Sequence, residues 1–333
     1  MSGPRISLVV NPAANRGAAA TVASRVAELL ARGAEVRVLA GSSQAESVSL
    51  LARAADRADA VIVCGGDGIA HLAANALAEG EVPLGIIPAG SGNDAAIALG
   101  MPADPVRAAE TLLAALRAGS VARVDLGHCA VDPALSDGHG QPHEIPPVAP
   151  AASGRWWLTM CYGGFDSAVN ERANRMRWPA GPRRYDVAIG LEMLRLRSHR
   201  VRLGLDDGAA LELPVTLVAI GNAPQYGGGK RMTPDAKMDD GIFDVTVVGP
   251  VSRLTLARLA PTLPRAGHIG HPAVSQYRAK EVWLAGDGVI AYADGERLAP
   301  LPIRTRCVPA ALPVLVPPDG PVPPGLTSLP APS

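Results

Sequence analysis

Short apolar runs alternate with stretches of helical periodicity through roughly the first 120 residues of the chain. Runs with the character of buried parallel strands lie at residues 6–10, 36–39, 61–64 and 84–87. Apolar residues recur at helical spacing between them, over residues 22–30, 46–57 and 72–77. Alternating elements of this size predict a doubly wound parallel α/β sheet.

From about residue 121 the pattern changes to short strands of the kind found in antiparallel sheets. Strands are expected at residues 201–205, 211–220 and 243–248, and a helix is expected around residues 185–197. Residues 282–284 and 289–292 are predicted to form a hairpin. The second part of the chain is therefore a largely β domain.

These patterns divide the chain into two domains and a tail. The first domain is expected at residues 1–124, with a return of the chain to it at 300–312, and the second at residues 125–299. An insertion rich in Pro, Gly and Ala at residues 132–153 lacks metal-ligand spacing and predicts a flexible surface loop. The Pro-rich residues 313–333 are expected to be a disordered tail.

Composition narrows the class of protein. Lys plus Arg and Asp plus Glu both number 31, so the net charge gives no argument for nucleic acid. No window approaches the roughly 18 apolar residues of a membrane span, and no secretory signal region is recognisable, so we expect a soluble, cytoplasmic protein. Four cysteines stand far apart without a CxxC pair, which favours reduced, packed thiols.

Two turns rich in small residues follow successive predicted strands of the first domain. The first is Gly65-Gly66-Asp67-Gly68, and the second is Pro88-Ala89-Gly90-Ser91-Gly92-Asn93-Asp94. Glycines at the carboxyl end of a parallel strand let the backbone approach a phosphate, and the next helix start favours its negative charge. Two other interpretations stay open: Asn93 and Asp94 as a helix cap, and Asp67 as a stabiliser of its turn.

Arginines gather between residues 172 and 202. They include Arg175, Arg177, Arg183, Arg184, Arg195, Arg197 and Arg200, against only Asp186 and Glu192. Such a region is either a solvated helix face or a docking surface for an anionic membrane, with nearby leucines adding apolar contact.

Four motifs stand in a fixed order along the chain: Gly65 to Gly68, Pro88 to Asp94, Asn222-Ala223-Pro224-Gln225-Tyr226-Gly227-Gly228-Gly229 with Pro234 and Asp239-Asp240-Gly241, and Asp294-Gly295-Glu296. This series resembles the diacylglycerol kinase catalytic family, which includes bacterial soluble lipid kinases and sphingosine kinases. The resemblance spans roughly residues 6–306. It implies a nucleotide-binding α/β domain joined to a lipid-binding β-sandwich, with ATP and lipid meeting in the cleft between them.

The resemblance also implies the nucleotide contacts and the cofactors. ATP would be the phosphate donor with Mg²⁺, bound by Asn11, Pro12, Ala13, Ala14, Asn15, Ser42, Gly65, Gly66, Asp67, Gly68, Gly90, Ser91, Gly92 and Asn93. Asp67 and Asp94 resemble the carboxylates that hold the catalytic Mg²⁺ through water. Asp240, with the Ile242 carbonyl, resembles a structural metal site, although Lys237 stands where a second acidic ligand is expected.

Phosphoryl transfer to a lipid hydroxyl requires a base near that hydroxyl. Glu296 matches the family's proton acceptor and Asp294 its partner, which with Asp67 completes the expected catalytic set. Taken alone, Asp294-Gly295 is also a common hairpin turn.

The chain departs from the family pattern at Ile69, where most relatives carry threonine, and at His71-Leu72, which replaces Asn-Glu. One phosphate-binding hydroxyl is lost, which predicts weaker nucleotide affinity and allows a rival interpretation as a non-catalytic nucleotide sensor. An NAD kinase would share the first glycine turn but not the other motifs. The expected reaction forms phosphatidic acid from diacylglycerol, with a sphingoid base or another long-chain alcohol as alternatives. Peripheral association with the inner membrane surface is expected, and a homodimer is allowed.

Overall fold

The computed structural model describes residues 3–10, 18–41, 44–135, 155–179, 181 and 183–330. The chain divides into two compact units, and each is described here by itself. Unit 1 consists of Met1–Leu126, Lys237–Gly241 and Val308–Ser333, and unit 2 consists of Gly127–Ala236 and Ile242–Cys307. The short segment Lys237–Gly241 was not expected in the first unit, because its sequence has no strand or helix periodicity.

Unit 1 is built on a parallel sheet. Its strands are β1 (Arg5–Val10), β2 (Glu35–Ala40), β3 (Ala60–Gly65) and β4 (Leu84–Pro88), in the order β2-β1-β3-β4. Strand β16 (Ile303–Leu315) adds to β4 in parallel through Val314 and Leu84. Every residue of β4 is buried, as is every residue of β3 up to Cys64, which is why both read as continuous apolar runs.

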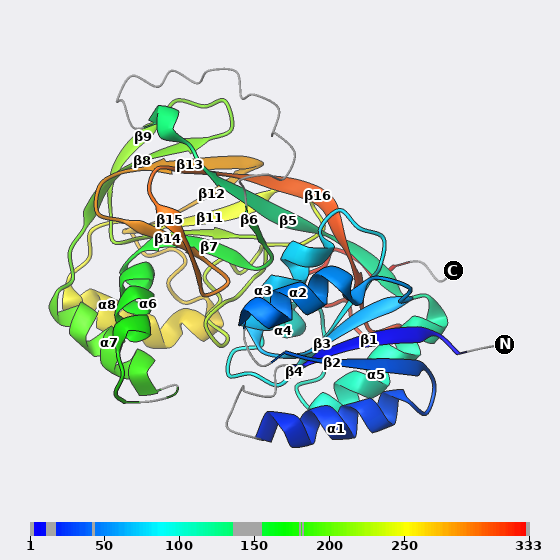
Figure 1. Cartoon of the computed structure of the whole chain (residues 1–333). Coiled ribbons are helices and arrows are strands. Elements are labelled where there is room, and N and C mark those ends of the chain that lie inside the picture. Colours follow the sequence, from blue (N-terminus) through cyan, green and yellow to red (C-terminus); the bar gives the residue numbers. More distant parts are fainter. Residues whose placement is uncertain are drawn as a thin grey trace. The chain divides into compact units, whose positions relative to one another are not determined.

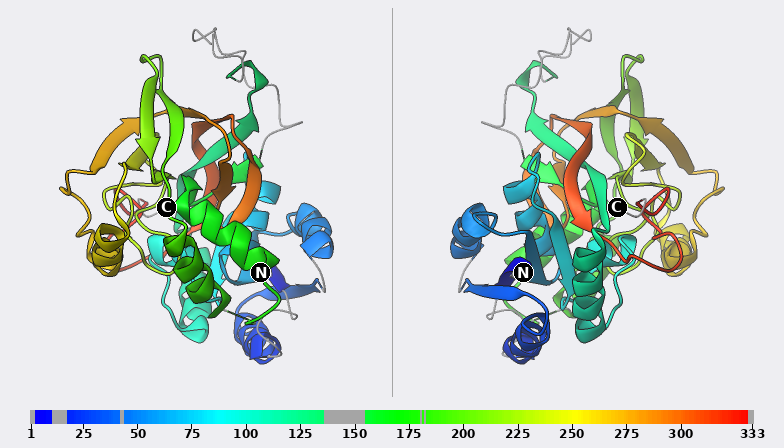
Figure 2. Two further views of the ribbon diagram at one scale, coloured as in Figure 1. Left: turned by 90° about the vertical axis from the view of Figure 1, so that its left-hand side faces the viewer. Right: turned by 90° about the vertical axis from the view of Figure 1, so that its right-hand side faces the viewer.

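Helices cover both faces of this sheet (Figures 1 and 2). They are α1 (Ala18–Leu30), α2 (Gln44–Ala54), α3 (Asp67–Leu77), α4 (Asp94–Ala98) and α5 (Pro105–Ala118). Helix α1 packs with α5, and α2 packs with α3 on the opposite face. The prediction of a doubly wound parallel sheet is confirmed.

Unit 2 contains two mainly antiparallel sheets. The first has the order β12 (Val274–Ala279), β11 (Phe243–Val248), β10 (Leu217–Gly221), β7 (Met160–Gly164), β14 (Ile290–Ala293) and β15 (Glu296–Pro300). In the second, the start of β16 pairs with β13 (Glu281–Ala285), followed by β8 (His199–Leu205) and β9 (Leu211–Val215). Strand β5 (Val121–Val131) pairs with β6 (Arg155–Trp157).

Buried side chains from both sheets of unit 2 form one core, which makes the unit a β-sandwich as expected. Trp157 stacks on Phe243 with ring centroids 4.9 Å apart, and Leu203 and Val282 contribute from the other sheet. The helices of this unit are α6 (Phe165–Arg175), α7 (Arg183–Leu194) and α8 (Arg253–Leu259), with short 3-10 turns η2 (Pro133–Leu135) and η3 (Ala260–Arg265).

Two predictions about the path of the chain are wrong. Strands β13 and β14 do not form a hairpin, because β13 lies between β16 and β8 while β14 lies between β7 and β15. Within residues 313–333, the described part is not a disordered tail: β16 continues to Leu315, Leu326 is buried, and the Gly325 amide donates to the Ala98 carbonyl. A few apolar residues and backbone bonds are enough to hold this Pro-rich segment on unit 1.

The four cysteines are free and buried, as expected from their spacing. Most of the 132–153 insertion lies outside the described residues, and Asp132 at its start pairs with Arg304 at 2.8 Å. None of the described helices combines the length and apolarity needed to cross a bilayer.

Candidate functional site

The two glycine turns of unit 1 are in backbone contact. Strands β3 and β4 pair side by side up to Gly65 and Pro88, and the Ala89 amide donates to the Gly65 carbonyl at 2.9 Å. A Cβ added to Gly90 would lie 2.3 Å from the Gly66 Cα. Only glycine fits at this crossing, so the two turns meet as bare backbone.

Asp67 links the two turns. It is the first residue of α3, and its Oδ1 accepts a hydrogen bond from the amide of Ala95, in the first turn of α4, at 3.2 Å. A Cβ added to Gly92 would lie 2.5 Å from Asp67 Oδ2 and 3.4 Å from Asp94 Oδ2. The carboxylates of Asp67 and Asp94 therefore converge on the second turn, at the edge of the sheet where the strands end.

Asn93 closes the second turn. Its Oδ1 accepts from the Gly90 amide at 2.8 Å and its Nδ2 donates to the Gly90 carbonyl at 3.0 Å, while its backbone is left-handed with φ of 62°. Its side chain makes no capping bond to α4. The interpretation of Asn93 as a side-chain cap is therefore wrong, since Asp67 supplies that bond from the other turn. Ser91 beside it is exposed.

Ile69 packs beneath the first turn. It is buried on α3, and a Cβ on Gly65 would lie 2.8 Å from its Cγ2. His71, two residues later, is also buried, with the Asn75 amide 3.4 Å from its Nε2. Both departures from the family pattern are thus packed parts of α3. The other predicted nucleotide contacts, Asn11, Pro12, Ala13, Ala14, Asn15 and Ser42, lie outside the described residues.

Asp240 lies in an acidic region of unit 1 around Asp125. The Asp125 carboxylate accepts from the Gly241 amide at 2.6 Å and from the Ala310 amide at 2.8 Å, which joins three chain segments. Burial raises the pKa of Asp125, and the charges of Asp240 and Asp239 raise it further. Across the described ranges no three His, Cys, Asp or Glu side chains are grouped to hold a metal. The structural metal at Asp240 and Ile242 stays a prediction.

In unit 2, Asp294 and Gly295 form the turn of the β14–β15 hairpin. Both have positive φ, 51° and 86°, as a tight two-residue hairpin turn requires. The Asp294 carboxylate accepts four hydrogen bonds of 2.7 to 3.2 Å, from the amides of residues 158–160 and the Thr159 hydroxyl. Asp294 thus anchors the turn to the chain that leads into β7 and to the first residue of that strand, a role that no sequence pattern indicated.

Glu296 begins β15 directly after this turn. It is half-buried, and its carboxylate has no hydrogen-bond or ion-pair partner within the described part of the chain. A carboxylate in this position is available to accept a proton from an outside group.

Glu171 ties helix α6 to the same hairpin. Its Oε1 accepts from the Tyr292 hydroxyl at 2.7 Å and from Arg297 Nε at 2.8 Å, and its Oε2 pairs with Arg175 at 2.8 Å. Burial opposes ionisation of Glu171, but the hydrogen bonds from Tyr292 and Arg297 outweigh it and hold the pKa below its ordinary value. Burial and the bond to Glu171 raise the pKa of Tyr292 to about 12, so its hydroxyl remains a donor.

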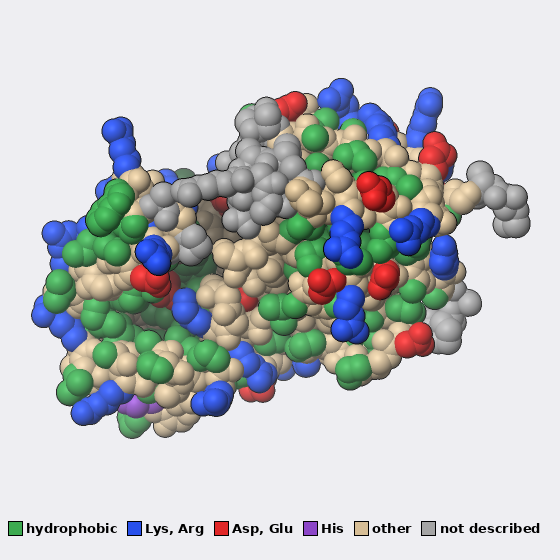
Figure 3. All heavy atoms as spheres, turned by 90° about the horizontal axis from the view of Figure 1, so that it is seen from below, with side chains coloured by type: hydrophobic (Ala, Val, Ile, Leu, Met, Phe, Trp, Pro, Cys, Tyr) green, Lys and Arg blue, Asp and Glu red, His purple; other side chains and the backbone are tan. Residues whose placement is uncertain are grey.

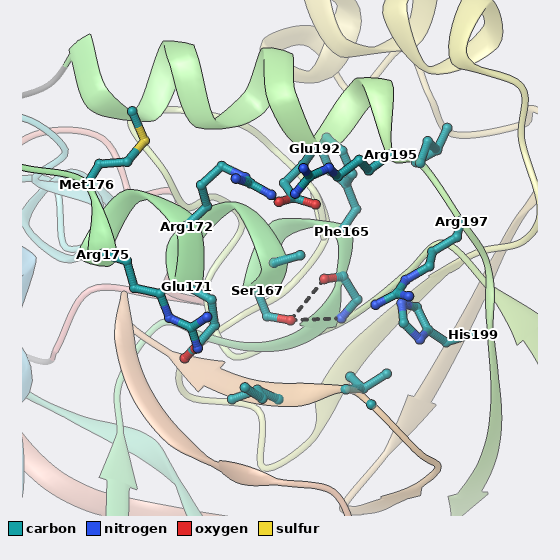
Figure 4. A pocket seen from close by; sticks show the side chains of 16 residues that line it. Phe165, Ser167, Glu171, Arg172, Arg175, Met176, Glu192, Arg195, Arg197 and His199 are labelled. Atoms are coloured by element: carbon teal, nitrogen blue, oxygen red, sulfur yellow. Dashed lines mark hydrogen bonds and ion pairs between the residues drawn. The ribbon is translucent and has the colours of Figure 1, made fainter. Parts of the chain in front are cut away.

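A cavity of about 720 Å³ opens in unit 2 beside α6 and α7 (Figure 4). Its walls come from α6, from the end of α7 and the segment after it, and from residues 288–290, where β14 begins. It has the size of a small-molecule site, and its lining mixes arginines with apolar side chains. The arginine-rich region was evident in the sequence, but nothing in the sequence predicted that some of these arginines would line a cavity.

Two family models match the chain. The diacylglycerol kinase catalytic domain matches residues 5–129, and the YegS C-terminal NAD kinase beta sandwich-like domain matches residues 159–316. Diacylglycerol kinase from Mycobacterium tuberculosis is 38% identical over 318 residues, which are 95% of this chain and 96% of that relative. Diacylglycerol kinase from Staphylococcus carnosus is 26% identical over 78% of this chain and 77% of its own length.

Solved structures share the fold. The crystal structure of a diacylglycerol kinase from Bacillus anthracis has a TM-score of 0.69 at 21% identity, covering 96% of this chain and 98% of that one. An NAD kinase from Archaeoglobus fulgidus in complex with ATP has a TM-score of 0.51 at 14% identity, covering 94% of both chains. The fold of this chain, an α/β unit joined to a β-sandwich, is thus that of the diacylglycerol kinase and NAD kinase structures.

Identity over nearly the full length places the chain more narrowly. The protein belongs to the diacylglycerol kinase family and is a lipid kinase.

Proposed function

We propose that this kinase transfers the γ-phosphoryl group of ATP to the hydroxyl of diacylglycerol and forms phosphatidic acid, a step of phospholipid metabolism. A sphingoid base or another long-chain lipid alcohol is the alternative acceptor. The observation that carries the proposal is the β14–β15 hairpin, where Asp294 is fixed by four hydrogen bonds and leaves Glu296 without a partner among the described side chains.

Unit 1 would hold the nucleotide. The meeting of Gly66 and Gly90 leaves backbone without side chains at the strand ends, which suits a triphosphate. The convergence of Asp67 and Asp94 supplies oxygen ligands of the type that Mg²⁺ takes from proteins, usually one or two carboxylates with water and phosphate. Bound there, the ion would neutralise charge on the transferring phosphoryl group.

Unit 2 would supply the base. As the lipid oxygen bonds to the γ-phosphorus, its proton passes to the Glu296 carboxylate, and the bond from phosphorus to the β,γ-bridging oxygen breaks to release ADP. Asp294 then acts as a positioning residue, because its oxygens are occupied by residues 158–160. The alternative, a non-catalytic nucleotide sensor, would not need the three carboxylates of Asp67, Asp94 and Glu296.

The enzyme would work as a peripheral protein on the anionic inner membrane surface, where its substrate resides. Figure 3 shows Lys and Arg side chains among hydrophobic ones on the left of the view and Lys and Arg side chains on its right as well. Trp178 is 83% exposed and follows the exposed Arg177 in the chain, while Leu194, the last residue of α7, is 64% exposed. An exposed aromatic among arginines is typical of an interface with anionic lipid.

The test is a kinase assay with the purified chain, Mg²⁺, labelled ATP and a panel of lipid alcohols in mixed micelles. We expect label in phosphatidic acid, and the lipid labelled best identifies the acceptor. Glu296→Gln should lower turnover by at least about 100-fold and leave ATP binding, measured by calorimetry, unchanged. ATP binding without labelling of any lipid would favour the sensor, and full turnover by Glu296→Gln would remove the base assignment.

A further inference from the structure

Residues 323–327, here called the C-terminal strap, lie against two parts of unit 1 that are distant from them in the sequence. The Gly325 amide donates to the Ala98 carbonyl at the end of α4 at 2.8 Å, and the Gly325 carbonyl accepts from the Met238 amide at 2.7 Å. Leu326, the next residue, is buried. The strap therefore joins α4 to the segment around Met238 through its own backbone.

Side chains on both sides of Met238 also bind the strap. Lys237 Nζ donates to the Pro324 carbonyl at 2.8 Å. The Asp239 carboxylate accepts the Thr327 amide at 2.9 and 3.0 Å on its two oxygens, and it accepts the Thr327 hydroxyl at 2.8 Å. Hydrogen bonds to a charged group are stronger than those between neutral groups. Thr327 on Asp239 is therefore the main anchor of the strap.

Helix α4 depends on contacts at both of its ends, because its five residues are too few to form a stable helix alone. At its start, the Ala95 amide donates to Asp67 at 3.2 Å. At its end, the Ala98 carbonyl is one of the acceptors that a helix leaves without an internal donor, and the Gly325 amide supplies that donor. A Cβ on Gly325 would lie 2.8 Å from the Ala98 oxygen, so the strap is closely packed on the helix. Asp94 is the first residue of this helix.

We propose that the C-terminal strap is a positioning element of the nucleotide site, with Thr327 as its positioning residue. By holding the end of α4, the strap keeps the Asp94 carboxylate converged with that of Asp67. The inference rests on the proposed function, which assigns both carboxylates to Mg²⁺. Release of the strap would leave α4 held at its start alone and would weaken MgATP binding, although no residue of the strap contacts the nucleotide.

The test compares Thr327→Glu, which sets a second carboxylate against Asp239, with Ser328→Glu, which adds the same charge at the next exposed residue. Thr327→Ser retains the hydroxyl and the amide and is the rescue variant. All three are made in the full-length Glu296→Gln chain. Hydrogen exchange is measured at the Ile97 and Leu99 amides, which donate to Asn93 and Ala95 in α4, and MgATP binding is measured by calorimetry. Unchanged exchange in the buried strand β10 shows that each variant is folded.

In Thr327→Glu we expect about tenfold faster exchange at both amides and about tenfold weaker MgATP binding, each equivalent to about 1.4 kcal/mol. Ser328→Glu and Thr327→Ser should match the Glu296→Gln parent in both measurements. Equal exchange in Thr327→Glu and Ser328→Glu would overturn the role of the strap in holding α4. Faster exchange at unchanged MgATP affinity would overturn the positioning role and leave a structural contact. Failure of the parent to bind MgATP would overturn the nucleotide site and the positioning role together, whereas the exchange data decide by themselves whether the strap holds α4.

Discussion

The acid-bearing turns of the two units of this kinase are held in opposite ways. In unit 1, the turns that carry Asp67 and Asp94 meet because side chains are absent, with Gly66 against Gly90. In unit 2, the Asp294 turn is held because donors are present, namely three amides and one hydroxyl from residues 158–160. The glycine contact in unit 1 should therefore be broken by an added side chain, whereas the Asp294 turn in unit 2 should be weakened by loss of its carboxylate acceptor.

The largest expected effect comes from adding an atom at the glycine contact. Gly90→Ala would place its Cβ 2.3 Å from the Gly66 Cα, so the turns must separate. We expect a loss of about 3 kcal/mol in the free energy of unfolding, measured by urea denaturation, and loss of ATP binding. Gly190→Ala in α7, where a Cβ meets nothing within 4 Å, is the control and should not destabilise the protein. Equal behaviour of the two variants would contradict the close contact.

The Asp294 turn should fail through lost hydrogen bonds instead. Asp294→Asn replaces a carboxylate that accepts four bonds with an amide that has one acceptor oxygen. We expect a loss of about 2 kcal/mol in unfolding free energy together with reduced turnover. Glu296→Gln, two residues away, should reduce turnover at unchanged stability, because its side chain bonds to none of the described residues. A stable Asp294→Asn variant with low turnover would make Asp294 a direct participant in the chemistry.

A smaller effect is expected where Glu171 ties α6 to the hairpin. Since the pKa of Glu171 is lowered in the folded protein, its contribution to stability is complete at neutral pH. That contribution is lost as the pH falls below about 4.5 and through the folded pKa. Glu171→Gln should cost about 1 kcal/mol at pH 7. The difference from wild type, followed by thermal unfolding, should shrink toward pH 3. A difference that does not vary with pH would exclude an ionised Glu171 as its source.

The smallest effect is expected at Ile69. Ile69→Thr would restore a hydroxyl next to the first glycine turn at the expense of a buried apolar contact. We expect roughly twofold tighter ATP binding, about 0.5 kcal/mol, measured by calorimetry. Ile69→Val, which adds no hydroxyl, is the matched control. Equal ATP affinity in the two variants would show that the hydroxyl has no part in nucleotide binding.

Much of unit 1 could be predicted because its signals are local. The predicted strands at residues 61–64 and 84–87 fall in β3 and β4, since a strand buried on both faces must be apolar throughout. The prediction of a disordered C-terminal tail was wrong, because a few tertiary contacts hold that Pro-rich segment in place. They include burial of Leu326 and the backbone hydrogen bond of Gly325. The hairpin at residues 282–292 failed because adjacent strands in a sandwich can belong to different sheets.

The arginine-rich region illustrates the same limit for the site. The sequence does not distinguish which of the seven arginines between residues 175 and 200 form ion pairs and which do not. The structure pairs Arg175 with Glu171 and, just before this series, Arg172 with Glu192, while Arg195 and Arg197 line a cavity. Pairing depends on which helix faces meet, and composition does not contain that information.

The sequence by itself determined the two-domain architecture and the order of the acid-bearing motifs, because strand periodicity and glycine turns depend only on residues close together in the chain. Only the tertiary structure decided that Asp67 caps the helix after the other turn, that Asp294 is occupied by residues 158–160, and that a cavity lies beside α6. Each of these depends on hydrogen bonds or packing between residues far apart in the chain, which spacing along the sequence does not specify.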